Sequence, residues 1–283
     1  MDMTCRNIIS FCNENVHNII EKMGQGRFSD HYIGHLFDGS EYRIFEGQEC
    51  IQYLQEYVPL HLRPIKNVLD NVIVASREFF TDTINIMDLG SGPATVPLAF
   101  CKIPSIRYAR NHKFHITTVE PSEGFNNMIN IFKATNTNEF IEIVNNLNYK
   151  LFDDNFMNDE SVFKTGYNWI IIANSISAIG KGRSNREVNA ILNKFISKVL
   201  DYSDKVLLTI IEGGTTKYFD FINYLDNIER TGFDDLRIIK TLSPKRLKIN
   251  VPEIMDCKFY KTHPIYPKYI PTTNSKSLLL ESK

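Results

Sequence analysis

Three polar positions directly follow runs of apolar residues. Asp88 ends the run in INIMDLGSGPATVPLAF, Glu120 ends the run in ITTVEPSEGF, and Asn174 follows the run in NWIIIANSISAIG. Short apolar runs bounded by turn residues are typical of buried strands. Because ligands bind beyond the carboxyl ends of parallel strands, the three positions predict a shared polar site at one edge of a sheet.

The stretch after Asp88 has the composition of a ligand-binding turn. Gly90 and Gly92 lack a Cβ atom, so the backbone can turn tightly there and approach a ligand closely. The helix expected next directs unpaired N–H groups toward the same place. Asp88 can pair with a ligand ammonium, and Glu120 can accept hydrogen bonds from both hydroxyls of a ribose.

Together these motifs resemble the class I S-adenosylmethionine-dependent methyltransferase family. The first motif of that family, an acid followed by Gly-x-Gly-x-Gly, is matched by DLGSGPA at positions 88–94, where Ala94 replaces the third glycine. The resemblance extends over residues 84–262 and implies S-adenosylmethionine as the cofactor.

The resemblance also implies roles for single residues. Gly90 and Gly92 would flank the methionine portion of the cofactor, and Glu120 would hold its ribose. Asn174 would lie beside the donor methyl group. The full set of expected cofactor-binding residues is Asp88, Gly90, Ser91, Gly92, Glu120, Pro121, Ser122, Asn174 and Ser175.

A dinucleotide-binding domain is the rival interpretation of the same glycine-rich turn. The acid that precedes Gly90 fits that class poorly, which favours the methyltransferase interpretation. The separation between Asp88 and Glu120 is long for a compact unit. We attribute the excess to a surface loop at 104–114.

Alternating strand and helix patterns begin after Thr81. They predict an α/β fold: a Rossmann-like, seven-stranded, mainly parallel sheet with helices on both faces and a helical N-terminal cap. The expected strands are 84–89, 115–120, 140–144, 169–173, 205–212, 236–242 and 258–262. The expected helices are 94–103, 122–135, 184–202 and 216–230, with an unassigned link at 145–168.

These patterns divide the chain into three parts. Residues 1–80 would form the helical cap, 81–264 the cofactor-binding domain, and 265–283 an extended tail. We expect the last two strands, 236–242 and 258–262, to pair antiparallel at the sheet edge. Pro59 and Pro64 are expected to break or kink the helix predicted over 47–80.

Methyl transfer from a sulfonium needs alignment and a dry pocket more than a particular side chain. His61, in the expected cap, is the best candidate for a base, although an ordinary half-buried helix histidine has the same pattern. Tyr57 is a second catalytic candidate, and the cap tyrosines equally suit an ordinary core. His31 and His35 lack a third ligand nearby, so we predict no metal site.

Composition limits the classes of function that remain. With 32 basic and 33 acidic residues the net charge is −1, which gives no whole-chain signature of a nucleic-acid binder. The five cysteines are scattered and include no CxxC pair, which favours a reducing cytoplasm over a zinc, cluster or disulfide framework. We expect neither a secretory signal nor a membrane span.

The sequence therefore predicts an S-adenosylmethionine-dependent methyltransferase that acts on a small-molecule acceptor by N- or O-methylation. RNA methylation stays open as an alternative, because basic residues gather at 237–248. A non-catalytic cofactor-binding partner subunit is the alternative from another class. A homodimer is compatible with the sequence.

Overall fold

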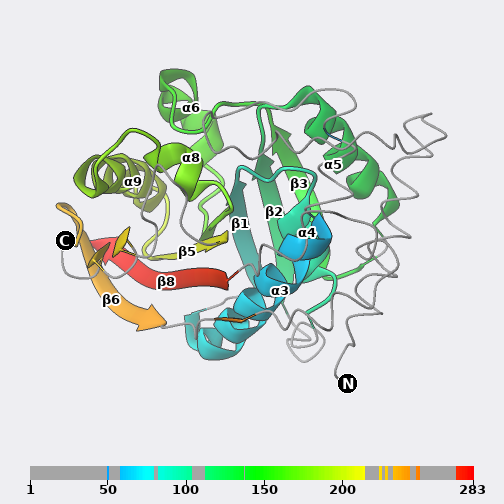
Figure 1. Cartoon of the computed structure of the whole chain (residues 1–283), viewed down its shortest axis with the longest axis horizontal. Coiled ribbons are helices and arrows are strands. Elements are labelled where there is room, and N and C mark those ends of the chain that lie inside the picture. Colours follow the sequence, from blue (N-terminus) through cyan, green and yellow to red (C-terminus); the bar gives the residue numbers. More distant parts are fainter. Residues whose placement is uncertain are drawn as a thin grey trace.

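The central feature of the structure, a computed structural model, is one mixed sheet (Figure 1). Its strands are β1 (Thr83–Leu89), β2 (Lys113–Val119), β3 (Ile141–Leu147), β4 (Trp169–Ala173), β5 (Val206–Gly213), β6 (Leu236–Leu242), β7 (Leu247–Lys248) and β8 (Thr272–Ser282). The structure describes residues 50, 58–79, 82–103, 112–136, 138–213, 223–224, 227–228, 232–242, 247–248 and 272–283.

Strand order places a change of direction beside β1. The order is β3-β2-β1-β4-β5-β8-β6, with the short β7 paired to β8. Strands β1 to β5 run parallel, whereas β8 runs antiparallel to its neighbours β5 and β6. The chain winds outward from β1 in one direction and then returns to start β4 on the other side. In sheets of this kind, ligands bind at that point of reversal.

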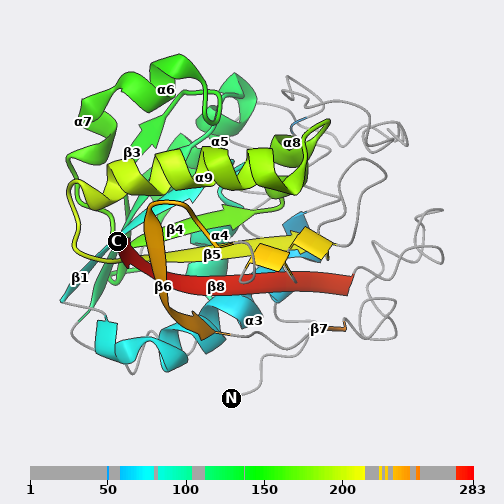
Figure 2. The ribbon, with the colours of Figure 1, turned by 90° about the vertical axis from the view of Figure 1, so that its left-hand side faces the viewer.

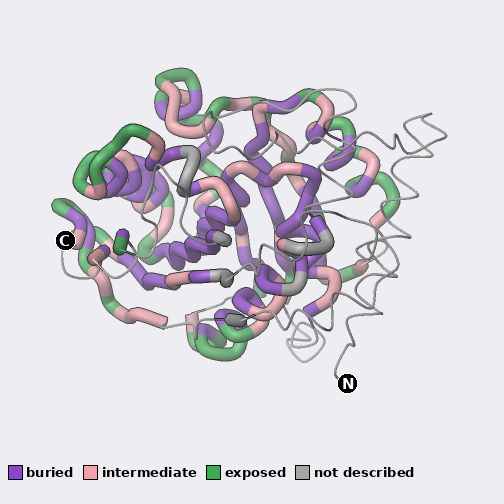
Figure 3. The backbone as a smooth tube through the Cα atoms, in the orientation of Figure 1, coloured by how far each residue is buried: buried purple, intermediate pink, exposed green. Residues whose placement is uncertain are grey.

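Two helical layers cover the sheet, as the sequence predicted (Figures 1 and 2). One hydrophobic core lies beneath α3, α4 and α5, and the other beneath α6 to α9. Figure 3 shows the buried residues concentrated along the central strands. The helices are α3 (Val58–Ala75), α4 (Thr95–Phe100), α5 (Glu123–Thr135), α6 (Asp154–Asn158), α7 (Glu160–Phe163), α8 (Ile176–Gly180) and α9 (Asn185–Leu200), with a 3-10 turn at Arg77–Phe79.

Most of the predicted elements are confirmed within one to three residues at each end. The helices expected at 94–103, 122–135 and 184–202 are α4, α5 and α9, and the unassigned link contains α6 and α7. Of the helix expected at 216–230, the described residues 223–224 and 227–228 are helical. No described helix is long and apolar enough to cross a membrane.

The C-terminal prediction needs correction, because the expected tail supplies a central strand. Residues Thr272–Ser282 form β8 between β5 and β6, so the sheet domain extends past position 264. The leucines at 278–280 are buried on both faces of the sheet, and this burial explains why the segment is ordered there. Strand β6 pairs with β8, whereas the partner predicted at 258–262 lies outside the described residues.

The described part of the expected cap is an integral layer of the fold. Helix α3 packs against the sheet core and continues through Pro64, so of the break or kink expected at this proline, the break is wrong. The helix buries Leu62, Ile65 and Val68, among others, and this packing offsets the hydrogen bond that proline removes. Of the remainder of 1–57, the structure describes Cys50 alone.

A buried polar chain fixes the pairing of β8. Trp169 Nε1 donates to Thr209 Oγ1 at 3.0 Å, and Thr209 Oγ1 lies 2.9 Å from Ser277 Oγ. All three residues are fully buried. Since an unpaired buried polar group is costly, this chain favours one register between β4, β5 and β8.

Replacing Thr209 by valine is expected to lower the free energy of unfolding by about 1–3 kcal/mol, because the indole N–H and the serine hydroxyl lose their partner. Thr117→Val is the matched control, since Thr117 is equally buried and its hydroxyl has no partner within the described structure. That control should be neutral or stabilising in urea denaturation. Equal losses in both variants would contradict the account.

Candidate functional site

The site lies where β1, β2, β4 and β5 end. Asp88 is next to last in β1, Glu120 follows β2, Asn174 follows β4, and Glu212 is next to last in β5. Parallel pairing brings these four carboxyl ends to the same edge of the sheet. The structure therefore brings together the strand-end residues that the sequence predicted.

A turn with three left-handed residues connects β1 to α4. Gly90 has φ +71°, Gly92 has φ +54°, and Ala94, in place of the third glycine, has φ +64°. The N–H groups of Gly90 and Ser91 donate to Val119 O at 2.9 and 3.3 Å. These bonds tie the turn to the end of β2 and bring it close to Glu120.

Asp88 is a buried carboxylate with one oxygen in use. Its Oδ2 accepts a hydrogen bond from Ser91 Oγ at 2.5 Å, whereas Oδ1 is buried and meets no donor within the described structure. Burial raises the pKa of Asp88 to about 7, the Ser91 bond opposes the rise, and the charge of Glu120 adds to it. A cationic ligand group would complete this environment.

Glu120 joins the two turns at the edge of the sheet. Its Oε2 accepts from Gly92 N at 2.8 Å and its Oε1 accepts from Ser122 N at 2.9 Å. Burial raises the pKa of Glu120 to about 7, despite the opposing effect of these two N–H groups. Each carboxylate oxygen can accept more than one hydrogen bond, so both can still bind ligand hydroxyls.

Ser122 begins the helix that follows Glu120. Its hydroxyl accepts from Phe125 N at 3.3 Å as the N-cap of α5 and lies 3.6 Å from Cys50 Sγ. Ser122 is fully buried, and Pro121 beside it is partly exposed. The hydroxyl thus helps to fix the first turn of α5 next to Glu120.

Asn174 joins the end of β4 to β5, and Ser175 joins it to the turn after β1. Asn174 has φ +57° and its N–H donates to Ile211 O at 2.7 Å. Ser175 Oγ lies 3.3 Å from both Gly90 O and Ala173 O. A Cβ atom on Gly90 would lie 2.2 Å from that hydroxyl, so residue 90 requires glycine for space as well as for φ.

The two catalytic candidates have different outcomes. His61 lies in the first turn of α3, and desolvation lowers its pKa to about 4, so it is neutral at pH 7 but a weak base. Tyr57 lies outside the described residues. The described residues contain no cluster of three or more potential metal ligands.

Two buried polar residues were missed by the sequence analysis. Glu212 and Asn274 are each 6% exposed and lie directly opposite each other in the β5–β8 ladder. Asn274 Nδ2 meets no acceptor within the described structure. Glu212 ends an apolar run as Asp88 and Glu120 do, so the same sequence pattern could have identified it. Asn274 had no such signal, because β8 was not predicted.

The basic cluster behind the RNA alternative is partly neutralised. Arg237 pairs with Glu281, and Lys240 Nζ lies 2.8 Å from Glu78 Oε1. Lys245 and Arg246 lie outside the described residues. Paired cations are less available for phosphate contacts.

Searches of family models and of curated proteins returned no match. Among solved structures, a loganic acid methyltransferase with SAH is 11% identical with a TM-score of 0.46, over 85% of this chain and 99% of that one. The plantazolicin methyltransferase BamL is also 11% identical with a TM-score of 0.46, over 98% and 100%. A SAM-dependent methyltransferase from Aquifex aeolicus is 12% identical with a TM-score of 0.42, over 83% and 98%. At this level of similarity, function has to be inferred from the site itself.

Gly90→Ala is expected to destabilise the protein more than Gly182→Ala. Both glycines have positive φ, but a Cβ on Gly182 meets nothing within 4 Å, whereas one on Gly90 meets Ser175. Gly182→Ala should lower the free energy of unfolding by about 1–2 kcal/mol through backbone strain alone. In urea denaturation, Gly90→Ala should lower it by clearly more. Equal costs would show that Ser175 does not enforce the glycine.

Asp88→Asn is expected to change how stability depends on pH. An acid whose pKa is raised on folding stabilises the fold below its unfolded pKa of about 4, and this contribution is lost as the pH rises through about 7. The parent should therefore be less stable at about pH 8 than at about pH 5, and Asp88→Asn should remove about 2–4 kcal/mol of that loss. The exposed Asp82→Asn is the control. An unchanged pH profile in Asp88→Asn would contradict the account.

Proposed function

We propose that the protein is an S-adenosylmethionine-dependent methyltransferase acting on a small-molecule acceptor. The observation that carries this proposal is the pair of buried carboxylates at adjoining strand ends. Asp88 offers an oxygen that meets no donor among the described residues, and Glu120 holds the glycine turn beside it. S-adenosylmethionine carries an ammonium at one end and ribose hydroxyls further along, so donors on the ligand match acceptors in the site.

The charge of the site favours this cofactor over a dinucleotide. A pyrophosphate needs N–H groups or cations and would be repelled by two desolvated carboxylates. A ligand bearing an ammonium and a sulfonium is attracted by the same groups. Its binding would favour the ionised forms of Asp88 and Glu120, whose pKa values burial raises to about 7.

When bound, the cofactor would supply a methyl group on a positively charged sulfur, and transfer of that methyl to an acceptor nucleophile would leave a neutral thioether. The residues of this chain would bind the cofactor and align it with the acceptor. Asp88 holds the ammonium, Glu120 holds the ribose, and Asn174 lies beside the position of the transferred methyl group. Rigid alignment of this kind can supply much of the barrier reduction.

We assign the acceptor to the β4–β5–β8 side of the same edge. Glu212 can accept from an acceptor N–H or O–H, and the amide of Asn274 can donate to an acceptor oxygen. The lowered pKa of His61 argues against this residue as the base that a hydroxyl acceptor would need, and N- and O-methylation both stay open. A catalytic role for Tyr57, the cytoplasmic location and the homodimer remain part of the proposal.

Isothermal titration with S-adenosylhomocysteine tests the proposal. The parent should bind one equivalent, and Asp88→Ala and Glu120→Ala should each lose about tenfold or more in affinity, because each removes a charge-assisted contact. Glu142→Gln is the matched control, since Glu142 is an exposed carboxylate on β3 that pairs only weakly with His115, at 3.7 Å. Folded, ligand-free parent protein that does not bind would overturn the proposal.

A second assay separates the alternatives. Labelled methyl groups from S-adenosylmethionine that enter RNA at low salt would favour the RNA alternative. Cofactor binding without transfer, either to RNA or to a panel of primary amines and phenols, would favour a non-catalytic partner subunit.

A further inference from the structure

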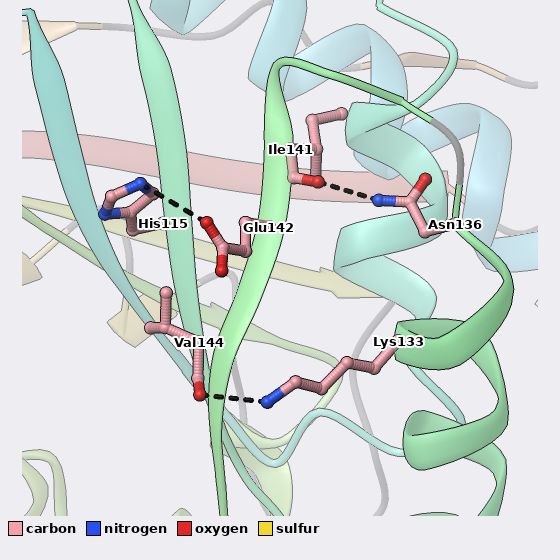
Figure 4. Close-up of polar contacts among 6 residues, drawn as sticks. All are labelled: His115, Lys133, Asn136, Ile141, Glu142 and Val144. Carbon is pink, nitrogen blue, oxygen red and sulfur yellow. Dashed lines mark hydrogen bonds and ion pairs between the residues drawn. The ribbon is translucent and has the colours of Figure 1, made fainter.

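The edge strand β3 contains a bulge that the pairing register reveals. Ile143 pairs with Ile116, but the next pair is Asn145 with Thr117, so Val144 is an extra residue in the ladder. Lys133 Nζ from α5 donates to Val144 O at 3.0 Å. Figure 4 shows this contact beside the bond from Asn136 Nδ2 to Ile141 O, so α5 and its C-cap residue hold β3 at the bulge and at the start of the strand.

The bulge decides which asparagine faces α5. Ile141 and Ile143 belong to the core beneath α5, and regular alternation would place Asn145 on that face next. The extra residue shifts the alternation by one, and Asn146 instead lies opposite Thr118. Bulges commonly redirect a side chain in this way beside binding sites.

Asn146 connects β2, β3 and the first turns of α5. Thr118 Oγ1 donates to Asn146 Oδ1 at 2.9 Å, and Asn146 Nδ2 donates to Asn126 O at 3.3 Å. Asn126 in turn donates from Nδ2 to Glu120 O at 2.8 Å. The chain of bonds therefore ends on the residue assigned to the ribose.

The amide of Asn126 has one end fixed and one end unused. Its nitrogen is bound to Glu120 O, while its Oδ1 is buried and meets no donor within the described structure. Asp88 Oδ1 is in the same state at the neighbouring strand end. A buried acceptor without a donor is costly and calls for an explanation, and a bound N–H or O–H group supplies one.

We infer that Asn126 is a further cofactor-binding residue, accepting from a hydroxyl or amino group of the adenosine half, and that Asn146 positions it. This inference rests on the proposed function. The adenosine half is assigned because Asn126 is bonded to Glu120, whereas the ammonium belongs to Asp88 on the neighbouring strand. The bulge at Val144 is the feature that makes Asn146 available for this task.

Titration of Asn126→Ala with S-adenosylhomocysteine and with 5′-methylthioadenosine, which lacks the amino-acid end, tests the inference. Both dissociation constants should rise about three- to tenfold, as for one lost hydrogen bond. Asn127→Ala is the matched control, because Asn127 is the next residue on the same helix and is exposed. An effect on S-adenosylhomocysteine alone would contradict the adenosine assignment.

A double-mutant cycle tests the role of Asn146. Asn146→Ala should weaken binding in the parent but not in the Asn126→Ala background, because it acts through Asn126. Affinities within twofold of the parent for Asn126→Ala, in protein whose thermal midpoint has fallen, would show a structural role only and overturn the inference. A parent that binds neither ligand would sink the proposed function itself, which is a distinguishable result.

Discussion

The desolvation of two carboxylates is the constraint on which the site depends. Asp88 and Glu120 are buried at adjoining strand ends, and each would be more stable in water. Ser91, Gly92 and Ser122 supply hydrogen bonds that compensate in part. The rest of the desolvation free energy is not compensated in the ligand-free protein. A ligand with cationic groups and hydroxyls can offset it by binding to the two carboxylates. Binding energy at this edge of the sheet therefore depends on charge and hydrogen-bond donors more than on apolar contact.

Fold topology explains why the two carboxylates meet. The chain passes from β1 to β2 and β3 on one side, and then crosses to β4 on the other side of β1. Within the part of the chain that the structure describes, no connection therefore crosses the carboxyl end of β1 between these two directions, and the glycine turn lies at that point. Space is limited there by Ser175 on one side, while Val119 O holds the turn on the other. Among the described residues at this edge, two buried acceptor oxygens meet no donor, one on Asp88 in β1 and one on Asn126 in α5. A buried donor that meets no acceptor there, Asn274 Nδ2, lies on the other side, in the β5–β8 pair.

The sequence predicted those strands and strand ends that are marked by a local run of apolar residues. Apolar runs ending in Asp88, Glu120 and Asn174 identified three strand ends and their common edge, because burial on both faces leaves a continuous apolar run. Strand β8 was missed since a polar stretch with one leucine run looks like a tail until its partners, β5 and β6, are known. The role of Asn146 was equally hidden. It depends on the bulge at Val144, and a one-residue shift in register leaves no mark on the sequence.

A crystal structure of the protein with S-adenosylhomocysteine tests the central claim most directly. We expect the ligand ammonium about 3 Å from Asp88 Oδ1 and the ribose hydroxyls on Glu120, with the glycine turn unmoved. A ligand whose ammonium lies away from Asp88, or whose ribose lies away from Glu120, would contradict it. In that case the two buried carboxylates would need another explanation.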